Sequence, residues 1–253
     1  METKDSVALV TGGNRGLGEG FVRVLLRDAR ARKVYVGSRD ARAAAHLVAE
    51  FPGRCEILTL DVTQGADIAA AAARCTDLTL LINNAGLFTN NLLMGGPNLE
   101  AAREEMEVNY FAPLALSRAF AATLARNGGG AIVNVLSSAA IVSVPNMGGY
   151  GPSKAAARSL STAIRAELAD QGTQVIALIV GSVDTRMAAH VQGTKEKPED
   201  IAHAGLRAVT HGIDEMDTDT MAVNVRAALA LDPKALEKRM AKMLKMTVIS
   251  TGR

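Results

Sequence analysis

The sequence contains no tryptophan and few other aromatic residues: three Tyr and five Phe, together 3% of 253 positions. Single-stranded nucleic acids bind on aromatic stacking platforms, so this scarcity argues against that class of function. Apolar residues are still 48% of the chain, which means that a core has to be built from aliphatic side chains. Any tyrosine that takes part in chemistry is Tyr35, Tyr110 or Tyr150.

Neither sign of charge dominates, since 28 Lys and Arg residues stand against 26 Asp and Glu residues, a net charge of +2. This balance argues against a nucleic-acid partner. Residues 233–246 are locally basic, and we interpret them as the solvated face of a helix. Docking on a membrane surface is the alternative for this stretch.

Cysteine is scarce as well, and neither Cys55 and Cys75 nor the four histidines show the spacing of metal ligands. We therefore expect no metal site and a reduced, cytoplasmic location. Residues 1–6 are polar and lack the apolar run of a signal peptide. The longest apolar runs, such as 175–180, are far too short to cross a membrane, so we expect no membrane partner.

Short runs of Val, Ile and Leu recur with little alternation, which is typical of strands buried on both faces of a parallel sheet. They lie at 7–10, 33–36, 56–60, 78–82, 131–136 and 175–180. Longer Ala-, Arg- and Glu-rich stretches of helical character separate them, at 17–28, 40–50, 64–75, 98–126 and 152–171. The alternation predicts an α/β fold: a doubly wound parallel sheet with helices on both faces.

No linker or internal repeat divides the chain, so we expect residues 1–253 to form a single domain. The pattern loosens after the last strand. Residues 181–212 are expected to form a loop and a helix beside the substrate. A short strand near 213–217 and a helical stretch over 218–246 complete the chain.

A glycine-rich turn directly follows the first apolar run, with the sequence Thr11-Gly12-Gly13-Asn14-Arg15-Gly16-Leu17-Gly18. Glycines allow a close approach of the backbone to a phosphate, and the helix that follows offers N–H donors at its N-terminus. The turn predicts a dinucleotide site, with a structural turn in another α/β fold as the alternative. The residues expected to contact the cofactor are Gly12, Asn14, Arg15, Gly16, Leu17 and Gly18.

The end of the second run indicates which dinucleotide binds. An NAD site usually has an acidic residue about 20 positions after the glycine turn, whereas this chain has Gly37, Ser38 and Arg39 there. A guanidinium at this place can bind a 2′-phosphate, and Arg15 is a second cation on the same side. We therefore expect NADP(H), unless both arginines are ordinary solvated residues. Asp40 is the contrary signal, and we interpret it as the cap of the next helix.

Polar and small residues also follow the third and fourth runs. Asp61 and Val62 follow the third run, and the Asp61 carboxylate either accepts from an adenine amino group or caps the next helix. Asn84, Ala85 and Gly86 follow the fourth run, and their small size leaves room for a ribose or a flat ring. Ligands of such a sheet bind at the carboxyl ends of its strands, so all five belong to the expected cofactor site.

Tyr150 stands four residues before Lys154 and two before Pro152. Proline is tolerated in a first helical turn, so we expect the helix to begin close to Pro152, with Lys154 one turn from Tyr150. A phenol in water has a pKa of about 10 and exchanges protons poorly at neutral pH. A nearby ammonium stabilises the phenolate, and the positive nicotinamide ring of NADP⁺ adds to this effect, so we expect a lowered pKa that makes Tyr150 a candidate general acid and base.

Two further polar positions have alternative interpretations. Ser137 and Ser138 follow the fifth run, where a hydroxyl can donate to a substrate carbonyl oxygen that gains negative charge. An ordinary turn is the alternative. Asn109 lies inside a helical pattern, where asparagine is unfavourable. Either it is exposed, or its side chain holds a water or a backbone carbonyl.

In their chain order these residues resemble the short-chain dehydrogenase/reductase family over residues 6–187. The matching residues are Thr11-Gly12-x-x-x-Gly16-x-Gly18, Asp61-Val62, Asn83-Asn84-Ala85-Gly86, Asn109, Ser137, Tyr150-x-x-x-Lys154 and Gly181-x-Val183-x-Thr185. The resemblance implies a Rossmann fold, a nicotinamide cofactor beside Gly181, Val183 and Thr185, and a catalytic group. That group consists of Asn109, Ser137, Tyr150 and Lys154.

The resemblance also implies a role for each member of this group. Tyr150 would be the acid in reduction and the base in oxidation. Lys154 would lower the pKa of Tyr150 and bind the nicotinamide ribose, and Asn109 would hold a water that joins Lys154 to solvent. Ser137 is preferred to Ser138, because the family's serine lies thirteen residues before its tyrosine. The Asn14-Arg15 and Ser38-Arg39 pairs resemble NADP(H)-using members, many of which are carbonyl reductases.

Three features depart from the family pattern. Val180 stands where the family usually has proline, and Leu136 replaces the usual first serine of its pair. The chain also lacks the Asp-Gly-Gly ending that packs in many family tetramers. A homo-oligomer, either a dimer or a tetramer, is still expected.

The sequence thus predicts an NADP(H)-dependent carbonyl reductase or alcohol dehydrogenase. Its partner would be a lipophilic small-molecule ketone, aldehyde or alcohol, because the candidate pocket residues are mostly apolar. These residues are Leu87, Phe88, Leu92, Leu93, Val144, Met147, Met187 and His190, for which ordinary packing is the alternative. Two rival functions use the same site: an epimerase, dehydratase or isomerase with bound cofactor, and a non-catalytic dinucleotide sensor.

Overall fold

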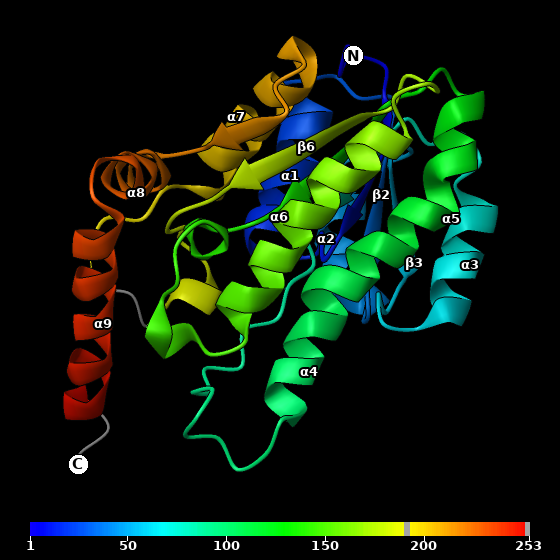
Figure 1. Ribbon diagram of the computed structural model, residues 1–253. Coiled ribbons are helices and arrows are strands. Elements are labelled where there is room, and N and C mark those ends of the chain that lie inside the picture. Colours follow the sequence, from blue (N-terminus) through cyan, green and yellow to red (C-terminus); the bar gives the residue numbers. More distant parts are fainter. Residues whose placement is uncertain (190–192, 251–253) are drawn as a thin grey trace.

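The computed structural model describes residues 1–189 and 193–250, and in it seven strands form one parallel sheet (Figure 1). The strands are β1 (Val7–Thr11), β2 (Lys33–Ser38), β3 (Cys55–Thr59), β4 (Leu80–Asn83), β5 (Ala131–Val135), β6 (Gln174–Ile179) and β7 (Glu215–Asp217). Their order in the sheet is β3-β2-β1-β4-β5-β6-β7. The order reverses between β1 and β4, which confirms the predicted doubly wound sheet and locates its ligand-binding crevice.

Helices cover both faces of the sheet (Figure 1). The helices are α1 (Gly16–Arg27), α2 (Ala45–Glu50), α3 (Gly65–Arg74), α4 (Glu100–Met106), α5 (Ala112–Arg126), α6 (Tyr150–Glu167), α7 (Pro198–His211), α8 (Thr220–Leu231) and α9 (Pro233–Ser250). Shorter helical segments are η1 (Ala41–Ala44), η2 (Glu107–Phe111), η3 (Ser138–Ala140), η4 (Pro145–Met147) and η5 (Arg186–Ala188).

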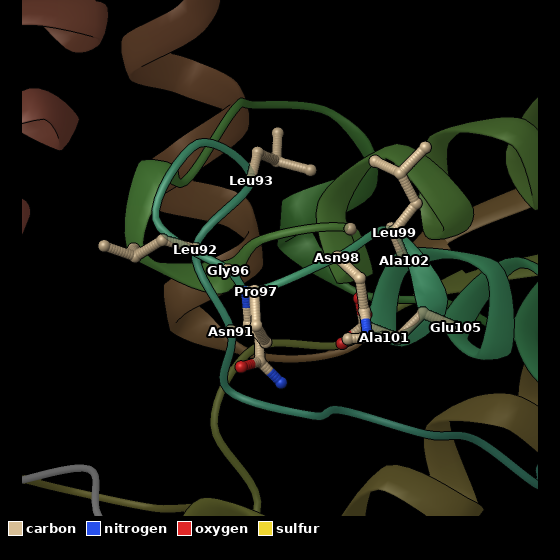
Figure 2. A pocket seen from close by; sticks show the side chains of 11 residues that line it. Asn91, Leu92, Leu93, Gly96, Pro97, Asn98, Leu99, Ala101, Ala102 and Glu105 are labelled. Carbon is tan, nitrogen blue, oxygen red and sulfur yellow. The ribbon is translucent and has the colours of Figure 1, made fainter.

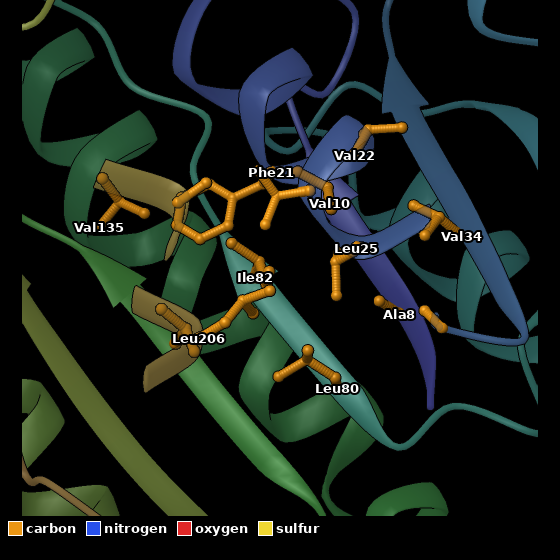
Figure 3. Close-up of a cluster of buried hydrophobic side chains, with 14 of the residues drawn as sticks. Ala8, Val10, Phe21, Val22, Leu25, Val34, Leu80, Ile82, Val135 and Leu206 are labelled. Carbon is orange, nitrogen blue, oxygen red and sulfur yellow. The ribbon is translucent and has the colours of Figure 1, made fainter. Parts of the chain in front are cut away.

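The alternation of side chains along the buried strands divides the core into two layers. Ala8 and Val10 of β1 face a cluster with Phe21 and Leu25 of α1 and Leu206 of α7 (Figure 3). The neighbouring β1 residues face the opposite cluster, which includes side chains of α3, α5 and α6. Both faces are therefore covered by mainly aliphatic packing, to which Phe21, Tyr35 and Phe120 add the buried aromatic rings.

The helix expected over 98–126 is interrupted, because α4 and α5 are joined by the π-helical segment η2. Pro113 explains the interruption. It has no N–H for the carbonyl of Asn109, four residues earlier, and its ring would clash with that carbonyl in a regular α-helix. Asn109 therefore lies in a widened turn, where it is buried.

Two other helix boundaries differ from the prediction. The helical stretch expected over 218–246 is two helices, because Asp232 has extended backbone before Pro233, and a residue before proline avoids the α conformation. Helix α6 begins at Tyr150, close to Pro152 as expected, but it ends at Glu167, before the predicted end at residue 171. Pro152 is then the third helical residue, still within the first turn, where no N–H is needed.

Candidate active site

The glycine turn closes tightly over the carboxyl end of β1. Gly12 and Gly16 have φ of +62° and +55°, which favour glycine, and a Cβ on Gly18 would overlap the carbonyl oxygen of Gly12. The methyl group of Thr185 would lie 3.2 Å from a Cβ on Gly16. The turn and the segment after β6 therefore lie side by side, with Asn14 and Leu17 both partly accessible on the turn.

Hydrogen bonds join the carboxyl ends of β1 and β4. The Thr11 hydroxyl accepts from the backbone N–H groups of Asn84 and Ala85, both at 3.0 Å, and Asn84 Nδ2 donates to the Thr11 carbonyl at 2.9 Å. Deeper in the sheet, Asn83 donates to Asn134 at 2.8 Å. These asparagines therefore tie neighbouring strands together and give the crevice a rigid floor.

The two arginines expected at a 2′-phosphate are exposed, and in the described part of the chain neither Arg15 nor Arg39 forms an ion pair. The Ser38 hydroxyl is buried and donates to the carbonyl of Asp40 at 2.9 Å. Asp40 accepts from the N–H of Arg42 as the cap of η1, so the interpretation of Asp40 as a helix cap is confirmed.

Asp61 organises the turn after β3. Its Oδ1 accepts from both the N–H and the hydroxyl of Thr63, at 3.0 and 2.8 Å. These bonds hold the pKa of the Asp61 carboxyl below its usual value, and the Arg39 charge adds to the effect. The N-cap of α3 is Gln64, so Asp61 caps a turn rather than the helix itself. Val62 beside it is buried.

Tyr150 and Ser137 meet at the start of α6. Both are 8% exposed, and their side chains are joined by a hydrogen bond that works to lower the pKa of Tyr150. Burial has the larger effect and raises the pKa of Tyr150 to about 12, and the charge of Glu105 acts in the same direction. The ring of Phe88 packs edge-on against Tyr150, with centroids 5.5 Å apart. Ser137, and not Ser138, is thus the serine that faces the tyrosine.

Lys154 is buried beside Tyr150, and its Nζ lies 5.7 Å from the centroid of the Tyr150 ring. The ammonium donates to the carbonyl of Val135 at 2.8 Å, and burial lowers the pKa of Lys154 to about 8. The expected lowering of the Tyr150 pKa by Lys154 does not occur in the protein alone. Burial prevails there, and the amine is directed toward a backbone carbonyl instead of the phenol.

Asn109 is 1% exposed, which excludes the exposed alternative. Its Nδ2 donates to the Leu87 carbonyl at 2.8 Å and to Ser153 Oγ at 2.9 Å, and its Oδ1 accepts from the Leu87 N–H. A Cβ on Gly86 would lie 3.3 Å from this oxygen and 3.6 Å from Lys154 Nζ. Asn109 thus holds the backbone after β4 beside Lys154 and Tyr150.

The segment after β6 is held by a residue that the sequence analysis missed. Gly181 N donates to Asp219 Oδ2 at 2.6 Å, and the other carboxylate oxygen accepts from Ala222 N as the cap of α8. Val183 is buried beyond this contact. An Asp before an apolar stretch predicts a helix cap. Nothing in the local sequence indicates that Asp219 also bonds to Gly181, 38 residues away.

Of the predicted pocket residues, Phe88 packs on Tyr150, and Leu87 is bonded through its backbone to Asn109. Leu92 and Leu93 line a cavity with the start of α4, whereas Val144 and Met147 lie at η4. Leu93 and Met187 are 55% and 45% exposed, so core packing does not explain them. His190 lies outside the described residues. Glu105 and Gly149 also line the cavity, and the sequence analysis missed both. The available signal for Glu105 was its position four residues before Asn109, which is the spacing of neighbours on a helix.

Within residues 1–189 and 193–250 no three potential metal ligands cluster. No helix in that part of the chain is long and apolar enough to cross a membrane. Cys55 and Cys75 are both free and buried.

Comparison with known proteins supplies context for this geometry. Residues 6–196 match the family model described as short chain dehydrogenase. A short-chain dehydrogenase from Burkholderia cenocepacia, crystallised in complex with NADP, is 41% identical with a TM-score of 0.89. That comparison covers 95% of this chain and 99% of the crystallised one.

Curated relatives are more distant. Dehydrogenase/reductase SDR family member 7B of Danio rerio is 32% identical over 81% of this chain and 74% of that protein. A 2,5-dichloro-2,5-cyclohexadiene-1,4-diol dehydrogenase of Sphingobium indicum is 30% identical over 71% of this chain and 73% of that protein. The match to the mouse family member 7B spans only 60% of that relative's length.

Proposed function

The chain belongs to the short-chain dehydrogenase/reductase family, and on that premise we propose that it is an NADP(H)-dependent enzyme interconverting a ketone or aldehyde with an alcohol. The observation that carries this proposal is the buried Tyr150–Ser137 pair with Lys154 beside it. A non-catalytic sensor has no need of a phenol and a hydroxyl directed at one another in a buried pocket. The relative from Sphingobium indicum, named as a diol dehydrogenase, is consistent with alcohol chemistry.

The residues of the crevice fit a nicotinamide dinucleotide. Gly12, Gly16 and Gly18 present backbone without side chains, which lets a pyrophosphate approach the turn closely, and the N-terminus of α1 supplies N–H donors there. Arg15 and Arg39 would hold a 2′-phosphate, which favours NADP(H) over NAD(H). The NADP bound to the Burkholderia cenocepacia relative supports the same choice.

Asp61 and Val62 would border the adenine, and the Asn84–Gly86 backbone, Gly181, Val183 and Thr185 the nicotinamide half. Ser38 contributes through the backbone it orients, because its hydroxyl is already bonded to Asp40. Lys154 would turn from the Val135 carbonyl to the nicotinamide ribose. When bound, the cofactor supplies the hydride in reduction and accepts it in oxidation.

In carbonyl reduction, Tyr150 donates its phenolic proton to the substrate oxygen as the hydride reaches the carbonyl carbon. Ser137 donates a hydrogen bond to the same oxygen and stabilises its developing negative charge. The phenolate that remains takes a proton back from solvent, with Lys154 and a water held near Asn109 as the route. Oxidation of the alcohol runs through the same groups in reverse, with Tyr150 as base.

The protonation of Tyr150 suits this sequence of events. Its pKa of about 12 in the protein alone keeps the phenol protonated, ready to donate in reduction. Oxidation needs the phenolate, and the positive charge of an oxidised nicotinamide would stabilise that anion. An ammonium of Lys154 drawn toward the ribose would act in the same direction.

The direct test is oxidation of NADPH across a panel of lipophilic ketones and aldehydes, with the alcohol product measured beside it. We expect one alcohol formed for each NADPH consumed. Turnover of a substrate without net NADPH consumption would instead favour an epimerase, dehydratase or isomerase.

We also propose a homo-oligomer, either a dimer or a tetramer, and a cytoplasmic location. Phe111 on η2 is 48% exposed beside Leu114 and Ala115 of α5, which leaves an apolar strip uncovered in one chain. Light scattering of the purified protein tests the association, and a monomer at micromolar concentration would contradict it.

A further inference from the structure

Glu105 of α4 is a buried carboxylate with one satisfied and one unsatisfied oxygen. The residue is 1% exposed. Its Oε1 accepts from both the N–H and the hydroxyl of Thr89, at 2.8 and 2.9 Å. Its Oε2 is buried and has no hydrogen-bond partner among the described residues. Burying a polar atom without a hydrogen-bond partner costs free energy, so we expect a bound ligand to donate a hydrogen bond to this oxygen.

The carboxylate lies at a cavity of about 130 Å³ between the loop after β4 and the start of α4 (Figure 2). The other lining residues are largely apolar or small, namely Asn91, Leu92, Leu93, Gly96, Pro97, Asn98, Leu99, Ala101, Ala102 and Gly149. A Cβ on Gly149 would lie 2.7 Å from Oε2 and 2.9 Å from the Ala102 Cα, so α4 and the Glu105 carboxylate pack closely against this glycine and leave no room for a side chain there. The volume suits a short alkyl chain with one polar end.

Residues next to one another in the chain connect the cavity to Tyr150. Gly149 directly precedes Tyr150, and Thr89 directly follows Phe88, whose ring packs on Tyr150. Glu105 is also close enough for its charge to raise the pKa of Tyr150. Tyr150 and Ser137 do not line the cavity themselves, so a molecule bound at Oε2 has to extend beyond the cavity for its carbonyl to reach Tyr150.

We propose that this cavity binds the alkylammonium end of the carbonyl substrate, with Glu105 Oε2 accepting from the ammonium and the leucine-rich walls holding its hydrocarbon. A cation is favoured over a neutral hydroxyl, because it donates to the oxygen and also compensates the buried negative charge. The inference rests on the proposed carbonyl reduction and narrows its substrate class to amino ketones or amino aldehydes.

A binding experiment tests the cavity without any turnover. Butylammonium chloride and 1-butanol are titrated calorimetrically into the full-length protein, which we expect to bind the amine at least about tenfold more tightly, as for a charge-assisted hydrogen bond. Glu105→Gln keeps an oxygen for Thr89 but removes the charge, and should abolish the preference. Glu104→Gln, the same change at the exposed neighbouring position, should retain it. Equal binding of amine and alcohol by the unmodified protein would overturn the proposal, as would a preference that survives Glu105→Gln.

A second variant covers the case in which Glu105→Gln fails to fold. Ala102→Leu adds bulk to the cavity wall and leaves Glu105 in place, so it should weaken butylammonium binding with no change of charge. Unchanged binding in Ala102→Leu would place the amine elsewhere and overturn the proposal.

Kinetics then connect the cavity to the reaction. A ketone with a pendant ammonium group should have a kcat/KM at least about tenfold above its methyl-ended counterpart, mainly through KM, since the added contact is made in the ground state as well. Glu105→Gln should remove that ratio. If neither ketone is reduced, the proposed function fails while the butylammonium titration still decides the binding site. Equal kcat/KM for the two ketones would contradict the amino-ketone assignment.

Discussion

The cofactor side and the substrate side of the crevice are held in different ways. On the cofactor side, Thr11, Asn83 and Asn84 bond neighbouring strand ends to one another, and the glycine turn has little freedom. On the substrate side, Leu93 and Met187 remain about half exposed, and a buried oxygen of Glu105 lacks a partner. The first region is complete within the chain and suits one constant ligand, whereas the second has contacts left for its ligand to make.

The largest expected effect comes from changing Tyr150, which lies between the cofactor side and the substrate side of the crevice. Tyr150→Phe keeps the ring but removes the proton, so kcat for ketone reduction should fall by about 10²- to 10⁴-fold. The dissociation constant for NADPH, measured by fluorescence titration, should stay within a small factor. Tyr110→Phe, a change at a partly buried position of η2, is the matched control and should keep its activity. A Tyr150→Phe protein with full kcat would rule out the mechanism.

The pH dependence of stability tests the buried amine. Lys154 has a folded-state pKa of about 8 against an ordinary value of 10.5, so above pH 8 the unfolded state holds more protons than the folded state. The free energy of unfolding should therefore gain a favourable contribution as pH rises from about 8 to 10, and Lys154→Met should lose this gain. Urea titrations of both proteins at pH 7, 8, 9 and 10 measure it. Parallel curves for the two proteins would show that the amine is not destabilised by burial.

Substitution of Asp219 tests whether its bonds to Gly181 and Ala222 hold the segment after β6 in place on the substrate side. Asp219→Ala removes the bonds to Gly181 N and Ala222 N, and should lower the free energy of unfolding by about 1–3 kcal/mol. Asp232→Ala removes an exposed cap bond to Ala235 N, and should cost about 1 kcal/mol or less. Urea denaturation measures both changes. Equal losses would mean that the contact with Gly181 adds nothing.

The smallest expected effect concerns the choice of cofactor. Arg39→Ala should raise KM for NADPH about tenfold and leave KM for NADH nearly unchanged, because only NADPH has the 2′-phosphate. Arg42→Ala changes another exposed arginine, which is bonded to Asp40, and is the control. A lower KM for NADH than for NADPH in the unmodified protein would show that Ser38-Arg39 was misinterpreted.

The features that the sequence could predict depend on local patterns, whereas those that it could not predict depend on contacts between distant segments. The strands, the glycine turn and the cap at Asp40 follow from local patterns, because each depends on residues close in the chain. The break at Asn109 depends on Pro113, whose spacing was visible but was outweighed by the long helical pattern. Pro233, which separates α8 from α9, was likewise visible in the sequence but was outweighed by the helical pattern around it.

Contacts between distant segments left no comparable pattern. Asp219 acts on Gly181, 38 residues earlier, and Glu105 on Thr89, 16 residues earlier. The spacing of Tyr150 and Lys154 says nothing about burial, which raises the pKa of Tyr150 in the protein alone, so the lowering expected with NADP⁺ bound stays a prediction. Only packing determines which effect prevails there.

The most direct test of Tyr150 as the proton-transfer group is its titration with and without bound NADP⁺. With only three tyrosines and no tryptophan, ultraviolet difference spectra of the unmodified protein minus Tyr150→Phe isolate one phenol. In the protein alone this phenol should titrate with a pKa of about 12. NADP⁺ should lower that pKa by at least about one unit, since a positive charge nearby favours the phenolate. An unchanged titration of Tyr150 on binding of NADP⁺ would contradict the account.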